Sequence, residues 1–262
     1  MFLQPEQFID RQIVASRGVW EAPLRRFMIE FVRSGEVFID IGAHKGYLTC
    51  LAAQLVGPTG KVISFEPDPR AFSALETNLK RNSFSSVNAF QVALGAEPGT
   101  IPLSLTKTLG NTSSFPNRIA IQEIEETIEV SCVRLDDVLA EFVHRSDPSI
   151  TLIKMDAEGA EPLIWAGMQR IIATHRPIVA LEINYASLLA AGQSVSSFKS
   201  ALAASGYHHF YEYDESIRGL RIRKTDIERE RELLVDVLAV PSGHQRFARL
   251  LSDGRLRVSE AA

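Results

Sequence analysis

The chain has 262 residues, of which 45 % are hydrophobic and 23 % are charged, an ordinary balance that predicts a globular fold with a core of normal size. Its net charge of −4 and pI of about 5.9 imply no general attraction to nucleic acid or anionic lipid. Two cysteines, Cys50 and Cys132, do not suggest a disulfide scaffold or a metal cluster, and they favour a reducing, cytoplasmic location. The sequence shows no signal-peptide pattern and no apolar run approaching the roughly 18 residues of a membrane span.

Residues 1–35 are predicted to form an N-terminal helical lead-in that packs on the core. In the segment Leu24–Val32, apolar side chains share one face of a helix, and Gly35 is typical of the end of such a segment. The alternative role for these helices is a lid over the substrate. No internal repeat or low-complexity linker interrupts residues 36–262, so we interpret them as a single domain.

A strand, a glycine turn and a helix then follow in close succession. Val37–Ile39 is a short run of β-forming residues that Asp40 ends, and Tyr47–Val56 continues as a helix of small and apolar residues. Between them, Gly42 permits a tight turn, and Gly46 falls where the helix would begin. Free N–H groups of the turn and the helix dipole would favour a carboxylate or a phosphate. The segment therefore predicts a cradle for a small molecule.

The glycine spacing argues against a dinucleotide in this cradle. The residues from Gly42 to Gly46 read GAHKG, which lacks the middle glycine of the G-x-G-x-x-G fingerprint. Asp40 also fits poorly beside a pyrophosphate, whereas its carboxylate suits an ammonium group such as that of S-adenosylmethionine (SAM). An NAD- or nucleotide-binding enzyme is one alternative, and a turn of purely structural role is another.

Strands and helices alternate in the next part of the chain. Lys61–Phe65 and Val87–Val92 are predicted strands on either side of a predicted helix, Arg70–Asn82. This alternation is typical of a parallel sheet with right-handed crossovers. The pattern then changes, because Ile101–Leu105 and Glu125–Val133 alternate with a period of two and predict an antiparallel β insertion.

The second half of the chain returns to the alternation of strands and helices. The predicted helices are Leu135–His144, Pro162–Ile172 and Ser194–Ser205, and the predicted strands are Thr151–Met155, Pro177–Ile183, Tyr207–Tyr213 and Leu233–Val240. The charged stretch Arg218–Glu232 is predicted to be a solvated loop. We expect the tail after Gly243 to fray or to dock weakly.

Polar residues or small ones lie at the ends of the predicted parallel strands. Ligands of parallel α/β sheets bind beyond the carboxyl ends of the strands, where the strand order reverses. The candidate site therefore consists of the residues at these ends, which are Asp40, Gly42, Glu66, Ala93, Asp156, Glu158 and Glu182.

The chemistry of these residues suggests their roles. Glu66, about 24 residues after the first glycine of the turn, can accept hydrogen bonds from both ribose hydroxyls and would repel a 2′-phosphate. Ala93 could line an adenine slot, with core packing as the alternative. Asp156 or Glu158 could act as a general base, although helix capping is the alternative for both.

Two further side chains have a candidate role in chemistry. His44 could contact the substrate or act as a base, because the pKa of histidine lies naturally near neutrality, and a simple hydrogen-bonding role is the alternative. Glu182 could join Asp156 as a pair of oxygen ligands for a metal ion. No third ligand is evident in the sequence, so no metal is predicted.

Six segments of the chain, taken together, resemble one protein family. They are FIDIGAHKGYLT from Phe38, VISFEPDP from Val62, VALG at Val92–Gly95, the GN-S loop at Gly110–Ser113, VRLDDVL at Val133–Leu139 and IKMDAEGAE at Ile153–Glu161. Their order and spacing over about Val37–Tyr185 resemble the FkbM-type family of SAM-dependent methyltransferases. The acid–glycine turn marks any class I methyltransferase, and the pattern IK-D-EG-E is far more specific.

The resemblance implies an α/β fold of the class I methyltransferase, Rossmann-like type. Its sheet would have seven mostly parallel strands in the order 3-2-1-4-5-7-6, helices on both faces and the β insertion between strands 3 and 4. The implied reaction is O-methylation of a small molecule, sugar or secondary metabolite with SAM as cofactor. An N-methyltransferase of the same fold and a non-catalytic SAM-binding module are the alternatives. The sequence identifies neither the methyl acceptor nor the oligomeric state, a homodimer included.

The resemblance also implies a role for each matching residue. The methionine part of SAM would be held by Asp40, Gly42, Ala43 and Gly46, the ribose by Glu66 and the adenine edge by Ala93, with Asp156 near the methyl group. One departure is His44, which stands where the family usually has asparagine. It leaves the affinity for the cofactor open and indicates a changed substrate edge.

Overall fold

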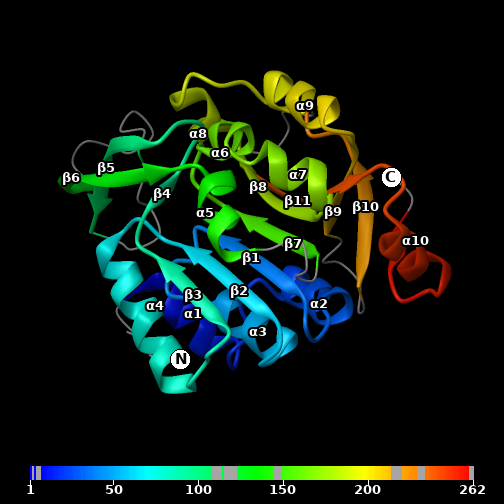
Figure 1. The fold of residues 1–262 in the computed structure, drawn as a ribbon, viewed down its shortest axis with the longest axis horizontal. Coiled ribbons are helices and arrows are strands. Elements are labelled where there is room, and N and C mark those ends of the chain that lie inside the picture. The colour runs from blue at the N-terminus through cyan, green and yellow to red at the C-terminus, as the bar shows by residue number, and fades with distance from the viewer. Residues whose placement is uncertain are drawn as a thin grey trace.

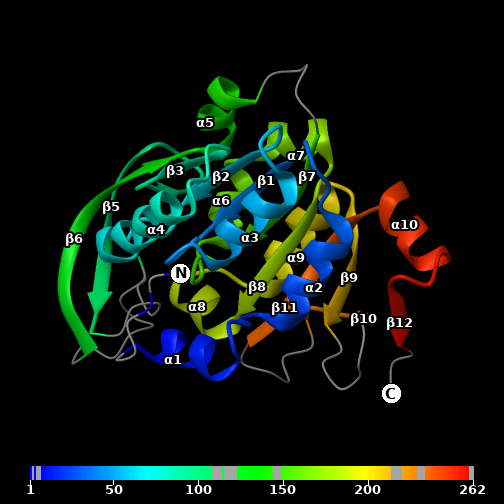
Figure 2. The same ribbon diagram turned by 90° about the horizontal axis from the view of Figure 1, so that it is seen from below.

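A large β-sheet with helices on both faces occupies the centre of the protein in a computed structural model (Figures 1 and 2). The structure describes residues 1, 3, 7–107, 114, 123–143, 149–213, 220–228 and 234–259. The first half of the chain forms α1 (Phe8–Ala15), α2 (Ala22–Phe31), β1 (Val37–Ile41), α3 (Tyr47–Val56), β2 (Lys61–Phe65), α4 (Pro69–Asn82), β3 (Val87–Phe90), β4 (Ala93–Leu94), β5 (Gly99–Thr106) and β6 (Ile124–Val133). The second half forms α5 (Leu135–Phe142), β7 (Ile150–Met155), α6 (Glu161–Ala166), α7 (Gln169–His175), β8 (Ile178–Asn184), α8 (Tyr185–Ala190), α9 (Val195–Ala204), β9 (Tyr207–Tyr213), β10 (Arg221–Thr225), β11 (Leu234–Pro241), α10 (Gln245–Ser252) and β12 (Arg257–Ser259).

The large sheet has nine strands in the order β12-β10-β9-β11-β8-β7-β1-β2-β3. The predicted number of seven is therefore wrong, because β10 and β12 extend the sheet beyond β9. The remaining strands run β3-β2-β1-β7-β8-β11-β9, and β11 is antiparallel to both of its neighbours. The chain order reverses between β1 and β7, and this is the position at which α/β sheets bind ligands.

The predicted β insertion is a separate three-stranded sheet with the order β4-β6-β5. β5 and β6 pair antiparallel from Gly99↔Cys132 to Thr106↔Ile124. The predicted strand Val87–Val92 is too long, because β3 ends at Phe90 and the next residues turn aside to pair with β6 as β4. The GN-S loop at Gly110–Ser113 lies outside the described residues.

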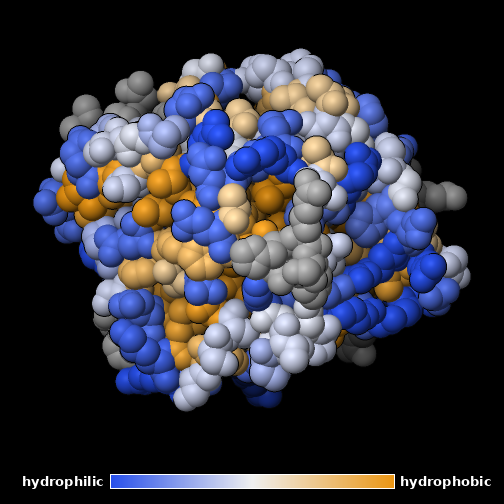
Figure 3. Space-filling model, in the orientation of Figure 1, coloured by the Kyte–Doolittle hydropathy of each residue, from blue (hydrophilic) through white to orange (hydrophobic). Residues whose placement is uncertain are grey.

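Two hydrophobic cores hold the helices against the faces of the large sheet. Helices α5 to α9 contribute to one core, which contains the fully buried Trp165, and α2, α3 and α10 contribute to the other. On the face drawn in Figure 3, hydrophobic residues gather toward β3 and the small sheet, and hydrophilic residues cover the side of β10. Among the described helices, none combines the length and the apolar composition needed to cross a bilayer.

The predicted helix Pro162–Ile172 is in fact two helices, α6 and α7, with a break at Gly167. A side chain at Gly167 would meet the carbonyl oxygen of Gly95 at 2.1 Å, so the chain passes another backbone at this point. The carboxylate of Asp136 then accepts the N–H groups of Arg170 (2.9 Å) and Ile171 (3.0 Å). A contact between distant parts of the chain thus starts a new helix.

The C-terminal region is more ordered than its composition indicates. Within the charged stretch Arg218–Glu232, residues 221–225 form β10, which pairs with β9 through Ile222↔Tyr213 and is therefore not a loop. In the tail, α10 buries Phe247 in the core, and Arg246 forms an ion pair with Glu36. The tail therefore docks through both apolar and charged contacts.

Candidate active site

A cavity of about 660 Å³ opens at the carboxyl ends of β1, β2, β7 and β8. Its size is that of a small-molecule site. All of the predicted site residues except Gly46 line it, together with Trp20, Glu21, Lys45, Lys154, Tyr213 and Asp236, which the sequence analysis did not single out as site residues. The strand ends therefore meet at one place, as the alternation of strands and helices predicted.

The turn after β1 is fixed by backbone contacts. The N–H groups of Gly42 and Ala43 both donate to Phe65 O at 3.0 Å, and the His44 N–H donates to Glu66 Oε2 at 2.7 Å. The expectation of free N–H groups in this turn is wrong for these residues. Gly42 has φ +74°, and a Cβ there would lie 1.8 Å from Asp156 O, so this glycine brings two strand ends together.

The end of the turn is anchored to two helices. A Cβ on Gly46, which has φ +80°, would lie 2.3 Å from Leu75 Cδ1 on α4. The buried side chain of Lys45 forms an ion pair with the buried Asp10 of α1 at 2.6 Å. The N-terminal helix therefore contacts the wall of the cavity directly.

Asp40 lies inside β1 and does not end it as the sequence predicted. Its carboxylate is 1 % exposed and accepts a hydrogen bond from Thr49 Oγ1 at 2.5 Å. The second oxygen, Oδ1, accepts no hydrogen bond from the described residues and lies 3.9 Å from Lys154 Nζ. Burial raises the pKa of Asp40, so this buried carboxylate would be stabilised by a cation.

Lys154 joins the ends of β1 and β7. Its Nζ donates to Gly42 O at 2.7 Å and lies 3.3 Å from Asp156 Oδ2. Although burial alone would lower the pKa of Lys154, the carboxylates of Asp156 and Asp40 raise it, and the side chain stays charged. The signal in the sequence was a lysine within an otherwise apolar strand.

Glu66 follows β2 directly and is 7 % exposed. Its Oε1 accepts the N–H of Asp68 at 2.9 Å, and Oε2 accepts that of His44. Burial raises the pKa of Glu66 to about 7. The two backbone hydrogen bonds fix the carboxylate at the cavity wall, and each oxygen keeps a further lone pair for a hydroxyl donor.

The raised pKa of Glu66 predicts a specific dependence of stability on pH. The folded state binds a proton at Glu66 up to about pH 7, whereas the unfolded chain releases it near pH 4.5, so this residue lowers the free energy of unfolding as the pH rises through that range. We expect the wild-type protein to lose up to about 3 kcal/mol relative to Glu66→Gln between these pH values. Urea unfolding of both proteins at several pH values measures the difference. A difference that stays constant with pH would show that the buried carboxyl does not titrate in this way.

His44 has the left-handed backbone angle φ 51° and a buried Nε2 that has no hydrogen-bond partner among the described residues. Burial, together with the charges of Lys45 and Lys154, lowers the pKa of His44 to about 4. The expected pKa near neutrality is therefore wrong. The imidazole is neutral at pH 7 and can accept a hydrogen bond, but it is a weak base.

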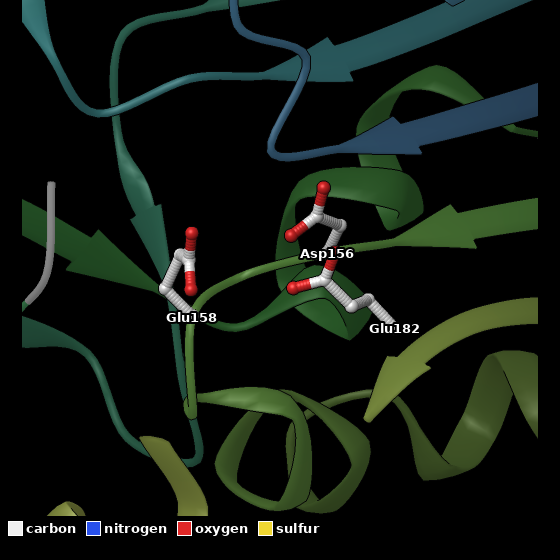
Figure 4. A group of neighbouring side chains, drawn as sticks. All are labelled: Asp156, Glu158 and Glu182. Carbon is white, nitrogen blue, oxygen red and sulfur yellow. The ribbon is translucent and has the colours of Figure 1, made fainter. Parts of the chain in front are cut away.

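Three carboxylates meet just beyond β7. Asp156 and Glu158 lie in the loop after this strand and Glu182 lies on β8, and an oxygen from each is within 4.8 Å of the other two (Figure 4). Sequence reasoning paired Asp156 with Glu182 and found no third oxygen ligand, but the structure brings Glu158 to the same point. Burial, Asp156 and Glu158 together raise the pKa of Glu182 to about 9.

The loop after β7 is held from below by Glu161. This buried carboxylate accepts the N–H of Ala157 at 2.8 Å and that of Gly159 at 3.0 Å. Helix α6 has Ala160 as its N-cap and no side-chain cap, so Asp156 does not cap it. Asp156 and Glu158 therefore remain available to line the cavity.

The opposite wall of the cavity is apolar. Ala93 is 7 % exposed, and Leu94 lies beside it on β4. Ile101 and Leu103 of the small sheet line the same cavity. This wall has the flat, apolar character that an aromatic base requires.

Comparison with known proteins relates this geometry to a family. The model of the methyltransferase FkbM domain matches residues 40–209. The chain belongs to the FkbM methyltransferase family. The match begins at Asp40 and includes both glycines of the turn, Glu66 and the acids after β7.

Individual members of the FkbM family resemble the chain over part of their length. Methyltransferase sdnD of Sordaria araneosa is 31 % identical over 52 % of this chain and 61 % of its own length. The 31-O-demethyl-FK506 methyltransferase FkbM of Streptomyces tacrolimicus is 30 % identical over 62 % of this chain and 68 % of its own. A crystal structure of methyltransferase FkbM from Methylobacillus flagellatus is 18 % identical, with a TM-score of 0.41 over 68 % of this chain and 44 % of that one. The chain thus spans less than two thirds of the length of sdnD.

Several cavity residues of this FkbM-family protein lie outside the matched stretch. Glu21 lies at the start of α2, Tyr213 at the end of β9 and Asp236 on β11. No motif identifies them, because only the fold brings them beside Asp156. An acid in each lone position has the sequence signature of an ordinary surface residue.

Proposed function

We propose that this chain is a SAM-dependent O-methyltransferase that acts on a hydroxyl group of a small molecule, sugar or secondary metabolite. The observation that carries the proposal is the cavity at the reversal of strand order, where Asp40, Glu66 and Asp156 meet an apolar wall. The name of the Streptomyces relative, a 31-O-demethyl-FK506 methyltransferase, supports oxygen as the acceptor atom.

The residues of the cavity fit the proposed cofactor. SAM carries positive charge at its ammonium and sulfonium groups, and the buried Asp40 Oδ1 accepts no hydrogen bond from the described residues. Asp40, Gly42, Ala43 and Gly46 would hold the methionine part, although Gly42 and Ala43 could do so only by shape, since their N–H groups bond to Phe65 O. Glu66 would accept the ribose hydroxyls, and Ala93 would contact the adenine edge.

The chain's own part in the reaction is to align the acceptor and to remove its proton. When bound, SAM supplies an electrophilic methyl group. Lys154 lies beside Oδ2 of Asp156, so Oδ1 of the same carboxylate is placed to take the proton of the acceptor hydroxyl. Glu158 is the alternative base. Alignment of the reacting groups supplies on the order of 7–11 kcal/mol in well-oriented systems.

Two other assignments use the same cavity. An N-methyltransferase would need a different acceptor but the same cofactor contacts, and a non-catalytic module would bind SAM without turnover. A cytoplasmic location, a single domain over residues 36–262 and the absence of a metal all stay predictions.

Isothermal titration calorimetry with SAM, its demethylated product S-adenosylhomocysteine (SAH) and NAD tests the proposal. We expect SAM and SAH to bind and NAD to give no signal. Glu66→Gln should weaken both cofactor complexes about 10- to 100-fold, because hydrogen bonds to a charged group contribute about 1.5–3 kcal/mol. Glu97→Gln, at an exposed position, serves as the matched control and should bind like the wild type.

Transfer of a labelled methyl group from SAM to a panel of hydroxyl and amine compounds then separates the remaining assignments. Products methylated on oxygen support the proposal. Binding of NAD in place of SAM, or methylation on nitrogen alone, would refute it.

A further inference from the structure

A row of acids crosses the edge of the sheet on the side of the cavity away from the apolar wall. Glu182 on β8 and Asp236 on β11 are direct partners in the antiparallel pairing of these strands, so their side chains share one face. Like charges directly opposite each other destabilise a sheet. Asp156 lies at the end of the neighbouring strand, and its carboxylate meets that of Glu182 (Figure 4).

A fourth acid reaches this row from the N-terminal region. Glu21 precedes α2 with a left-handed backbone angle of φ 46° and lines the same cavity. Its Oε1 accepts a hydrogen bond from Trp20 Nε1 at 3.1 Å. Burial and the charges of Asp156 and Asp236 raise the pKa of Glu21 to about 7, although Lys154 opposes this shift. Negative charge is therefore concentrated beyond what the fold neutralises.

The cavity supplies few positive side chains against these acids. Among the described residues, the lysines that line it are Lys45 and Lys154. Lys45 is committed to Asp10 at 2.6 Å, and the Nζ of Lys154 is committed to Gly42 O and to Asp156. The acids farther along the row thus face the cavity without a lysine of their own.

An independent feature of the same wall also indicates a ligand. The hydroxyl oxygen of Tyr213 is buried, lines the cavity and has no hydrogen-bond partner among the described residues. The β9–β11 register, with Val237 opposite Glu212, places Tyr213 beside Asp236 when continued by one pair. A buried hydroxyl without a partner costs about 1–3 kcal/mol, so a polar ligand group would satisfy it.

We propose that the methyl acceptor carries a positively charged amino group near its hydroxyl, and that Glu182, Asp236 and Glu21 hold this group. The inference rests on the proposed function, because it assigns the acceptor half of the same cavity. The rings of Trp20 and Tyr213 also line the cavity and suit an organic ammonium, which is attracted to aromatic faces. A bare metal ion is less suited, because Lys154 Nζ already lies 3.3 Å from Asp156, the carboxylate that a metal would need.

Paired probes that differ only in charge test this inference on the SAH-loaded protein. We use glucosamine, tyramine and ethanolamine, each against its N-acetyl derivative, and measure the dissociation constants by calorimetry. The amine of at least one pair should bind 10-fold or more tightly than its N-acetyl form. In Glu182→Gln and in Glu182→Gln/Asp236→Asn this preference should fall toward one, whereas Glu97→Gln should keep it.

The outcomes distinguish this inference from the function on which it rests. If SAH itself does not bind, the proposed function fails. If SAH binds and no amine is preferred in any pair, or if the preference survives in both acid variants, the inference alone is overturned. It is also overturned if EDTA abolishes amine binding and Mg²⁺ restores it, because the acids would then hold a metal. Should the double variant fail to fold, Glu182→Gln alone decides, since burial already favours its uncharged form.

Discussion

Replacing Gly42 with alanine is expected to destabilise the protein by about 2–5 kcal/mol and to weaken SAM binding. The left-handed backbone at φ +74° costs a residue with a side chain about 1–2 kcal/mol. The added Cβ would also lie 1.8 Å from the carbonyl oxygen of Asp156, and relief of such overpacking costs about 1–3 kcal/mol. The two strand ends would have to separate, so the cofactor half and the catalytic half of the cavity would lose their alignment. Chemical denaturation and calorimetry with SAH measure the two effects.

Gly243 is the matched control for this substitution. Its φ of +75° equals that of Gly42 within a degree, but a Cβ there meets nothing within 4 Å. Gly243→Ala should therefore cost only the backbone contribution of about 1–2 kcal/mol and leave SAH binding unchanged. Equal losses of stability in the two variants would mean that the contact between Gly42 and Asp156 is not important.

Asp156→Asn is expected to bind SAM as the wild type does and to transfer its methyl group about 100- to 10,000-fold more slowly. The amide keeps the shape of the carboxylate but cannot take a proton, and a positioned general base contributes this factor to the rate. Asp156 lies outside the apolar wall and beside Lys154, so the substitution should leave the adenosine contacts intact. Single-turnover transfer of labelled methyl from SAM, with any acceptor that the wild type methylates, gives the rate.

Glu158→Gln is the informative partner of Asp156→Asn, because both acids lie in the same loop and contact the same cluster. We expect this variant to keep a rate within a few-fold of the wild type. A full rate in Asp156→Asn together with a large loss in Glu158→Gln would transfer the role of base to Glu158.

The sequence predicted those features of the fold that depend on local patterns. The strand before the glycine turn, the helix Tyr47–Val56 and the strand Lys61–Phe65 were all found where periodicity placed them. The acids at the strand ends came together because parallel strands carry their carboxyl ends to one edge. Local sequence therefore sufficed for the cofactor half of the candidate site.

Features that depend on contacts between distant residues were missed. The break between α6 and α7 depends on Asp136, which lies more than 30 residues upstream, and on the approach of Gly167 to Gly95. The pKa of His44 depends on burial and on two lysines, neither of which a sequence pattern reveals. Glu21 and Asp236 enter the candidate site from the two ends of the chain. The acceptor half of the cavity could therefore be recognised only in the folded protein.

A crystal structure of the protein with SAH tests most directly whether the acid-lined cavity is a cofactor site. We expect SAH to lie between the glycine turn and Ala93, with its ribose hydroxyls on Glu66, its ammonium group near Asp40 and its sulfur facing Asp156. A ligand bound elsewhere, or a cavity that stays empty at a saturating SAH concentration, would contradict the account.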